Sequence, residues 1–163
     1  MSANLNSLYS SIVFEHDRRP QNAGLREPYE SEVHHVNPTC GDELTMRLHL
    51  SGEGPQAIIE DISYDAVGCS MSRASASIMS DLLIGQTLEQ AQKIYDSFAT
   101  AMASRGQDPG DEDMIGDGIA LVGASKFPGR VKCVLLAWKA FEALQVEAQA
   151  VLARSERDQN QVS

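Results

Sequence analysis

The chain has 163 residues, of which 42% are apolar and 22% charged, a composition typical of one compact domain. Its 23 Asp and Glu residues outnumber its 13 Lys and Arg residues, and the formal net charge of −10 disfavours nucleic acids and anionic membranes as partners. No apolar run approaches the roughly 18 residues of a membrane span, and residues 1–11 lack the features of a signal peptide.

We therefore expect a cytoplasmic protein that does not bind nucleic acid or membrane. A single domain should cover residues 1–163, with its core at about 5–152 and a polar C-terminal tail at 153–163.

The first half of the chain predicts one helix followed by three strands. Apolar residues at helical spacing indicate a helix over residues 4–18, which ends before Pro20. The strands are expected at residues 29–36, 44–50 and 57–67, and the middle one shows strict alternation of apolar and polar side chains. Because their connections are short, we expect an antiparallel three-stranded sheet.

The second half predicts helices. One should begin at about Cys69 and end at Gly85, and the next should begin at a capping box formed by Thr87 and Gln90. Residues 106–129 are rich in Gly, Asp and Pro and indicate a long excursion, and loops of that length are uncommon unless they are functional or partly structured. A last long helix should begin at Pro128 and fade into the polar tail. The expected fold class is α/β in the sense of α+β, a small sheet covered by helices.

The chain has three cysteines: Cys40, Cys69 and Cys133. A disulfide framework needs a larger and even number of cysteines, so it is not expected here. In a reducing compartment they stay thiols, which leaves metal binding, redox chemistry and nucleophilic chemistry, or simply packed inert thiols. Each lies at the end of an expected element, where sites are commonly built.

The Cys40-Gly41-Asp42 segment has the pattern of a two-ligand arm, because a glycine turn can aim both side chains at one point. With Cys69 and Cys133 it makes a Cys₃Asp set, which suits tetrahedral zinc. The spacing matches no zinc finger, so isolated packed thiols remain the alternative. Arg130 and Lys132 flank Cys133 and either support its thiolate or are solvated cations.

Histidines offer a different class of site. The four histidines, His16, His34, His35 and His49, could suggest a Cys–His nucleophile pair in an enzyme acting on small substrates. His34 and His35 are adjacent on an expected strand and point to opposite faces, so at most one of them could face Cys40.

Three segments carry a resemblance to a known family: Asn37–Asp42 (Asn-Pro-Thr-Cys-Gly-Asp), Gly68–Ser77 and Arg130–Trp138. In this order they resemble the three cysteine blocks of the U-type iron–sulfur cluster assembly proteins, the IscU-like and NifU N-terminal-like family. The likeness runs from about Leu8 to Leu144. It implies an α/β fold with a small antiparallel sheet covered by helices, in agreement with the expected elements.

Two features resemble the SufU branch of the family rather than the scaffold branch. Lys132 precedes the third cysteine where the scaffold branch has a histidine, and the segment 70–132 is longer than in that branch. The resemblance implies a zinc-dependent sulfurtransferase that takes persulfide sulfur from a SufS-type cysteine desulfurase and passes it to the iron–sulfur assembly machinery.

In that family the residues that match Cys40, Asp42, Cys69 and Cys133 are the zinc ligands, and the residue that matches Cys40 is the sulfur acceptor. The alternative is an IscU-like scaffold, a non-catalytic protein that holds an iron–sulfur cluster in place of zinc.

Overall fold

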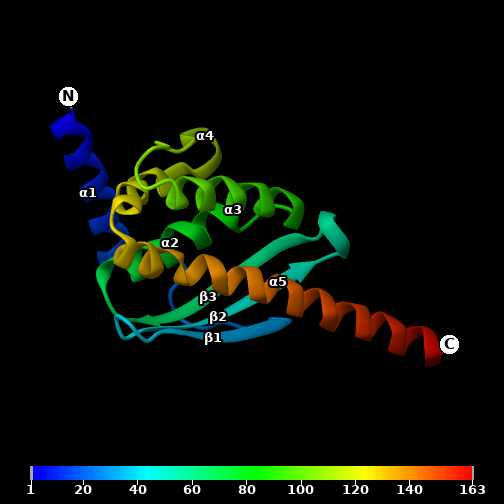
Figure 1. Cartoon of the computed structure of the whole chain (residues 1–163). Helices are drawn as coiled ribbons and strands as arrows, with labels where there is room; N and C mark the ends of the chain where they lie inside the picture. Colours follow the sequence, from blue (N-terminus) through cyan, green and yellow to red (C-terminus); the bar gives the residue numbers. More distant parts are fainter. Residues whose placement is uncertain (1, 163) are drawn as a thin grey trace.

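A computed structural model describes the backbone of residues 2–162 and the side chains of residues 8–154. The elements are α1 (Ser2–Arg18), β1 (Ser31–Asn37), β2 (Asp42–Ser51), η1 (Gly54–Gln56), β3 (Ile58–Val67), α2 (Ser70–Leu83), α3 (Leu88–Ala103), α4 (Glu112–Ile115), η2 (Gly116–Lys126) and α5 (Pro128–Val162). Helices cover one face of a three-stranded antiparallel sheet, so the predicted α+β class is confirmed (Figure 1).

The sheet has the order β1-β2-β3, and both pairs of strands are antiparallel. The alternation in β2 sets its faces, because successive side chains of a strand point to opposite sides. Leu44, Met46, Leu48 and Leu50 all face the helices and are at most 4% exposed. The α2 and α5 helices pack on this apolar face (Figure 1).

The centre of the core joins three helices through one tryptophan. Trp138 of α5 is fully buried and stacks on Phe98 of α3, with ring centroids 4.2 Å apart. Its indole N–H donates to Ser75 Oγ of α2 at 3.1 Å, and the Ser75 hydroxyl donates to the carbonyl of Val134 at 2.6 Å. The packed rings and the satisfied polar groups fix the position of α5 relative to α2 and α3.

The ends of α2 and α3 follow the sequence pattern. Cys69 is the N-cap of α2, and Gly85 after its end has a φ of 92° that favours glycine. Thr87 caps α3 by accepting a hydrogen bond from the Gln90 amide at 3.1 Å. The Gln90 side chain donates to Met114 Sδ at 3.7 Å, which ties α3 to the segment that follows it.

Most of the predicted excursion at residues 106–129 is helical rather than loop. The segment forms α4 and the eleven-residue 3₁₀ segment η2, in which Ile119, Leu121 and Val122 are buried. These apolar residues pack η2 against α1, α2, α3 and α5, and this tertiary burial outweighs the loop preference of the surrounding Gly and Asp residues. The helix α5 also continues to Val162 through the predicted tail, whose side chains from residue 155 onward lie outside the described part.

A separate structural finding concerns membranes. No helix in the described residues combines the length and the apolar character that a membrane crossing requires.

The stacking of Phe98 on Trp138 leads to a prediction about the stability of the protein. Phe98→Ala removes a fully buried ring, so it should lower the free energy of unfolding by about 3–5 kcal/mol. The control Val146→Ala changes a side chain that is 64% exposed, so it should shift the free energy of unfolding by less than about 0.5 kcal/mol. Urea unfolding followed by far-ultraviolet circular dichroism measures both. Equal midpoints for the two variants would contradict this account of the core.

Candidate metal centre

Four chain segments meet at one end of the sheet. The β1–β2 turn carries Cys40, β2 begins with Asp42, Cys69 lies between β3 and α2, and Cys133 lies near the start of α5 (Figure 1). The antiparallel register brings them together, because the end of β1 and the start of β2 pair at Asn37 and Asp42, and the end of β3 pairs next to them.

A tight turn presents Cys40. The carbonyl of Asn37 accepts hydrogen bonds from the amides of Gly41 at 2.9 Å and Cys40 at 3.3 Å. Gly41 closes the turn with a φ of 72°, a conformation that favours glycine. Cys40 is therefore exposed on the turn, whereas Asp42, two residues later, is fully buried on the helix-covered face.

Gly68 allows β3 to approach Asp42. A Cβ at Gly68 would overlap the Asp42 carboxylate and would lie 2.9 Å from its Cα, and the φ of 143° also favours glycine. This close approach lets the amide of Cys69 donate to Asp42 Oδ1 at 2.9 Å. Gly68 therefore connects the position of Cys69 to that of Asp42.

The donor atoms form a compact group. One ligand atom from each of Cys40, Asp42 and Cys133 lies within 4.8 Å of the others. The sulfurs of Cys40 and Cys133 are 2.9 Å apart. Cys69 is not in this group of three, but its Sγ lies 3.6 Å from Asp42 Oδ2. The structure thus places all four sequence-predicted ligands side by side, with Asp42 linking Cys69 to the others.

The electrostatics of the site depend on Asp42. Burial by itself raises the pKa of this carboxyl, but hydrogen bonds from the Cys69 amide, from the thiols of Cys133 and Cys69 and from Ser72 outweigh burial and lower the pKa below its ordinary value. Burial, together with Cys40 and Asp42, raises the pKa of the Cys133 thiol far above its ordinary value. Three sulfurs and a carboxylate can therefore be negatively charged together only beside a cation.

This donor set fits zinc. Thiolates and one carboxylate oxygen are ligands that zinc accepts in tetrahedral sites, and three cysteines with one aspartate complete four positions. A centre of this kind keeps a net negative charge, which favours hydrogen-bond donors and cations around it.

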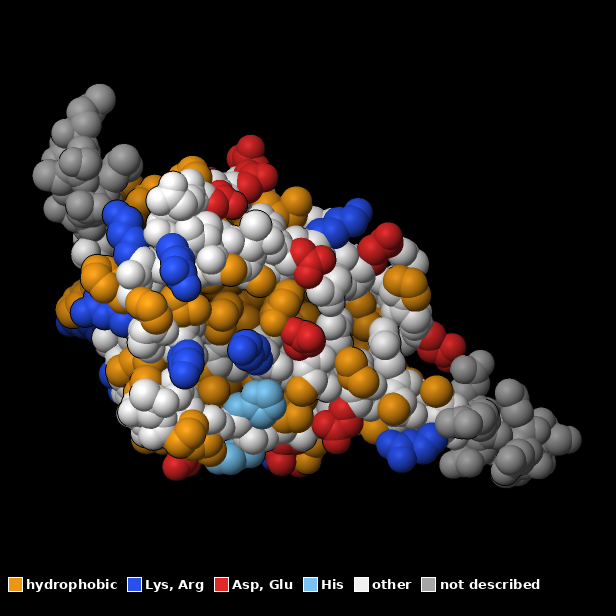
Figure 2. All heavy atoms as spheres, in the orientation of Figure 1, with side chains coloured by type: hydrophobic (Ala, Val, Ile, Leu, Met, Phe, Trp, Pro, Cys, Tyr) orange, Lys and Arg blue, Asp and Glu red, His pale blue; other side chains and the backbone are white. Residues whose placement is uncertain are grey.

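The flanking cations lie at the surface. Arg130 and Lys132 are exposed, and the Arg130 guanidinium lies over the Phe127 ring, 5.2 Å from its centroid. Figure 2 shows Lys and Arg side chains gathered mainly at the side where α5 begins, with Asp and Glu mainly above α4 and farther along α5. The cationic side chains thus lie at the end of the molecule that carries the donor group. A direct role of Arg130 and Lys132 toward the thiolates stays a prediction.

Three of the four histidines, His16, His34 and His49, make contacts away from the donor group. Among the described residues, no histidine belongs to the donor group. His34 contacts Thr45 at 2.8 Å on the outer face of the sheet, and His16 contacts Ser77 at 2.7 Å and Asp117 at 2.9 Å. The Cys–His nucleophile pair therefore gains no support from these contacts.

Sequence reasoning did not single out Asn37 as a site residue. Its side chain is only 6% exposed, and its Nδ2 donates to Cys40 Sγ at 3.1 Å. The residue belongs to the Asn37–Asp42 segment, but an uncharged amide has no metal-ligand signature. Only the hairpin register, which sets Asn37 opposite Asp42, brings it to the sulfurs.

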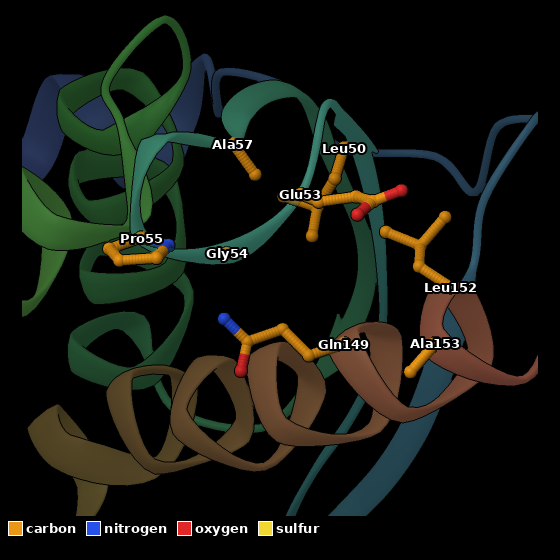
Figure 3. Close-up of a pocket in the computed structure, with 8 residues that line it drawn as sticks. All are labelled: Leu50, Glu53, Gly54, Pro55, Ala57, Gln149, Leu152 and Ala153. Carbon is orange, nitrogen blue, oxygen red and sulfur yellow. The ribbon is translucent and has the colours of Figure 1, made fainter. Parts of the chain in front are cut away.

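A pocket lies at the end of β2 that is far from the donor group, between the β2–β3 connection and α5 (Figure 3). It has a volume of about 340 Å³ and is lined by Leu50, Glu53, Gly54, Pro55, Ala57, Gln149, Leu152 and Ala153. Its lining holds no cysteine or histidine, so its chemistry is unlike that of the donor group.

Comparisons with known proteins identify the family to which the chain is similar. A model of the NifU-like N terminal domain matches residues 8–134, which include all four donors. The zinc-dependent sulfurtransferase SufU of Bacillus subtilis (strain 168) is 38% identical over 141 residues, covering 86% of this chain and 91% of that protein. The iron–sulfur cluster assembly scaffold protein IscU of Streptococcus pyogenes serotype M1 is 37% identical over 147 residues, covering 90% and 88%.

The fold is also similar to solved structures. A protein of Fervidobacterium islandicum AW-1, described as an iron–sulfur cluster assembly scaffold for the SUF system, superposes with a TM-score of 0.69 and 28% identity. The superposition covers 84% of this chain and 96% of that one.

The close approach at Gly68 predicts a specific defect. Gly68→Ala should push Asp42 and Cys69 apart and weaken zinc binding by about tenfold or more, because groups that orient ligands contribute strongly to metal affinity. Gly123→Ala is the matched control, since a Cβ there meets nothing within 4 Å. Competition with a chromogenic chelator measures the affinities. Unchanged affinity in Gly68→Ala would show that this contact does not position the ligands.

Proposed function

Because this chain belongs to the family of NifU-like N-terminal domains, we propose that it works in iron–sulfur cluster assembly as a zinc-dependent sulfur-transfer protein. Family membership confirms the resemblance carried by the three cysteine segments. The proposal makes the protein an enzyme, a sulfurtransferase that acts together with a SufS-type cysteine desulfurase. It passes the sulfur to downstream assembly components.

The observation that carries the proposal is the donor group itself. Cys40, Asp42 and Cys133 converge within 4.8 Å, and Cys69 adjoins them through Asp42. We propose these four residues as the zinc ligands. Four donors complete a tetrahedral set without Lys132, which precedes the third cysteine and is exposed. Bound zinc would keep the sulfurs deprotonated without redox chemistry of its own.

We propose Cys40 as the sulfur acceptor because it differs from the other cysteines. Cys133 is buried within α5. Cys69 is exposed like Cys40, but it caps α2 and its amide donates to Asp42, so it is tied to the helix and to the carboxylate. Cys40 lies exposed on a turn that ends at Gly41, so its side chain can reach a partner without unfolding a helix. Cys69 and Cys133 then act as anchors.

The transfer step balances without an oxidant. The Cys40 thiolate attacks the terminal sulfur of the desulfurase persulfide and forms a new S–S bond at Cys40. The S–S bond in the desulfurase breaks, and its cysteine leaves as a thiolate with the electron pair. The sulfur moves in its oxidised state from one cysteine to the other. Because all thiols must stay reduced for this step, we place it in the cytoplasm.

Exposed apolar side chains beside the site offer a surface for the desulfurase. Val36 and Val67 both pair with Glu43 of β2, so they share the outer face of the sheet at the cysteine end. They are 50% and 63% exposed, and Phe127, just before α5, is 53% exposed. Partner surfaces are commonly built from such apolar residues with cations around them.

Metal analysis is the first test. The protein purified without added metal should contain about one zinc per chain and little iron or sulfide, because the four donors complete a tetrahedral site. Removal of the zinc should lower the melting temperature, since binding to the folded state stabilises it. Near-stoichiometric iron and sulfide in anaerobic preparations, with little zinc, would instead support the IscU-like scaffold.

The acceptor assignment predicts the behaviour of Cys40→Ser. With a SufS-type desulfurase, its pyridoxal cofactor and cysteine, the wild-type protein should accelerate alanine formation. Cys40→Ser should return the rate to that of the desulfurase alone, because a hydroxyl cannot accept the sulfur. Thr39→Ser, in the same exposed turn, is the control and should accelerate as the wild type does.

Full acceleration by Cys40→Ser would exclude Cys40 as the acceptor. The variants Cys69→Ser and Cys133→Ser should also fail, but with loss of zinc and a lower melting temperature, because each removes an anchoring sulfur.

A further inference from the structure

We infer that Asn37 is a positioning residue for the proposed acceptor: its amide N–H binds the sulfur of Cys40 and restrains its reactivity while Cys40 is held in the metal centre. The inference rests on the proposed function, because it concerns how the acceptor is controlled. Asn37 touches neither substrate nor metal in this account and acts through Cys40.

The contacts of the Asn37 side chain fix its orientation. Its Oδ1 accepts a hydrogen bond from the Thr39 amide at 3.2 Å, which is only available to the oxygen end of the group. The nitrogen end therefore faces the sulfurs and lies 3.1 Å from Cys40 Sγ and 3.9 Å from Cys133 Sγ. One amide thus contacts the two sulfurs that are 2.9 Å from each other.

The burial of the donor favours this contact, although Cys40 itself is exposed. The Asn37 side chain is 6% exposed and lies opposite Asp42 on the helix-covered face of the hairpin. Water competes little for a buried donor, and a hydrogen bond to a charged acceptor is stronger than one between neutral groups. Its position in the strand and in the turn holds the amide in place before any partner arrives.

The chemical effect follows from the charge of the site. Three thiolates and one carboxylate leave a zinc centre negatively charged, and an N–H donor draws electron density from the sulfur that it contacts. A sulfur with less electron density is a weaker nucleophile. Loss of the amide should therefore make Cys40 more reactive in the metal-loaded protein and a stronger electron donor to the metal.

Asn37 has a second role that the test must separate. Its Oδ1 supports the turn through Thr39, and a serine hydroxyl can accept from the same amide in a similar local turn. Asn37→Ser keeps a turn acceptor but is too short to reach the sulfurs with an N–H. Asn37→Ala removes both the acceptor that supports the turn and the N–H that contacts the sulfurs. The pair distinguishes the contact with sulfur from the support of the turn.

The experiment uses the full chain loaded with Co²⁺ for spectroscopy and with Zn²⁺ for reactivity. In both variants the sulfur-to-cobalt charge-transfer band should move to lower energy than in the wild type, since the sulfur donates more strongly. Iodoacetamide should alkylate Cys40 faster in both variants than in the wild type, as measured by peptide mass spectrometry. Thr39→Ala, which keeps the Asn37 amide, should match the wild type in both measurements. Trp138 emission checks that each variant is folded.

Each result decides the inference. Wild-type behaviour of Asn37→Ser would overturn it, whether or not Asn37→Ala is altered, because Asn37 would then act at most on the turn. If Asn37→Ser is unfolded or binds no metal, Asn37→Gln is measured in its place. Because it keeps the amide, its sulfur-to-cobalt charge-transfer band should lie at the wild-type energy. A folded Asn37→Gln whose band lies at lower energy would overturn the inference as well. Absence of a sulfur-to-cobalt band in the wild type would contradict the proposed metal centre itself.

Discussion

A fully buried carboxylate needs hydrogen bonds or a cation, and the site is built around the one that Asp42 carries. Its oxygens accept from the Cys69 amide and contact the Cys69 sulfur, and its pKa is held below the ordinary value by these neighbours. Gly68 makes the approach possible because any Cβ there would overlap the carboxylate. The position of Cys69 at the start of α2 follows from this contact, whereas the β1–β2 turn, through its hydrogen bonds to the Asn37 carbonyl, positions Cys40.

Burial sets Cys133 apart from Cys40 and Cys69, which are both exposed. Cys133 is buried on α5, which the stacked Trp138 and Phe98 rings hold against the rest of the core. Cys40 is exposed in a turn that depends on hydrogen bonds to Asn37. A metal centre with one sulfur on a turn and another fixed in the core can release the first without losing the second, and the proposed transfer requires this difference.

The sequence predicted the parts of the fold that local patterns determine. The alternation around Met46 predicted β2 and its buried face, and Thr87 predicted the start of α3. The helices within the excursion at 106–129 were not predicted, because the burial of Ile119 and Leu121 depends on distant helices. The four proposed ligands were predicted from their residue types and family segments, whereas Asn37 was not, because its role arises only from pairing with Asp42.

The central claim is that sulfur enters this protein at Cys40. It is tested most directly by mass spectrometry of the zinc-loaded wild-type protein after a brief reaction with a SufS-type desulfurase and cysteine, with the added sulfur assigned to individual peptides. The account predicts that the added sulfur appears first on the peptide that contains Cys40. Sulfur found first on Cys69 or Cys133 would contradict it.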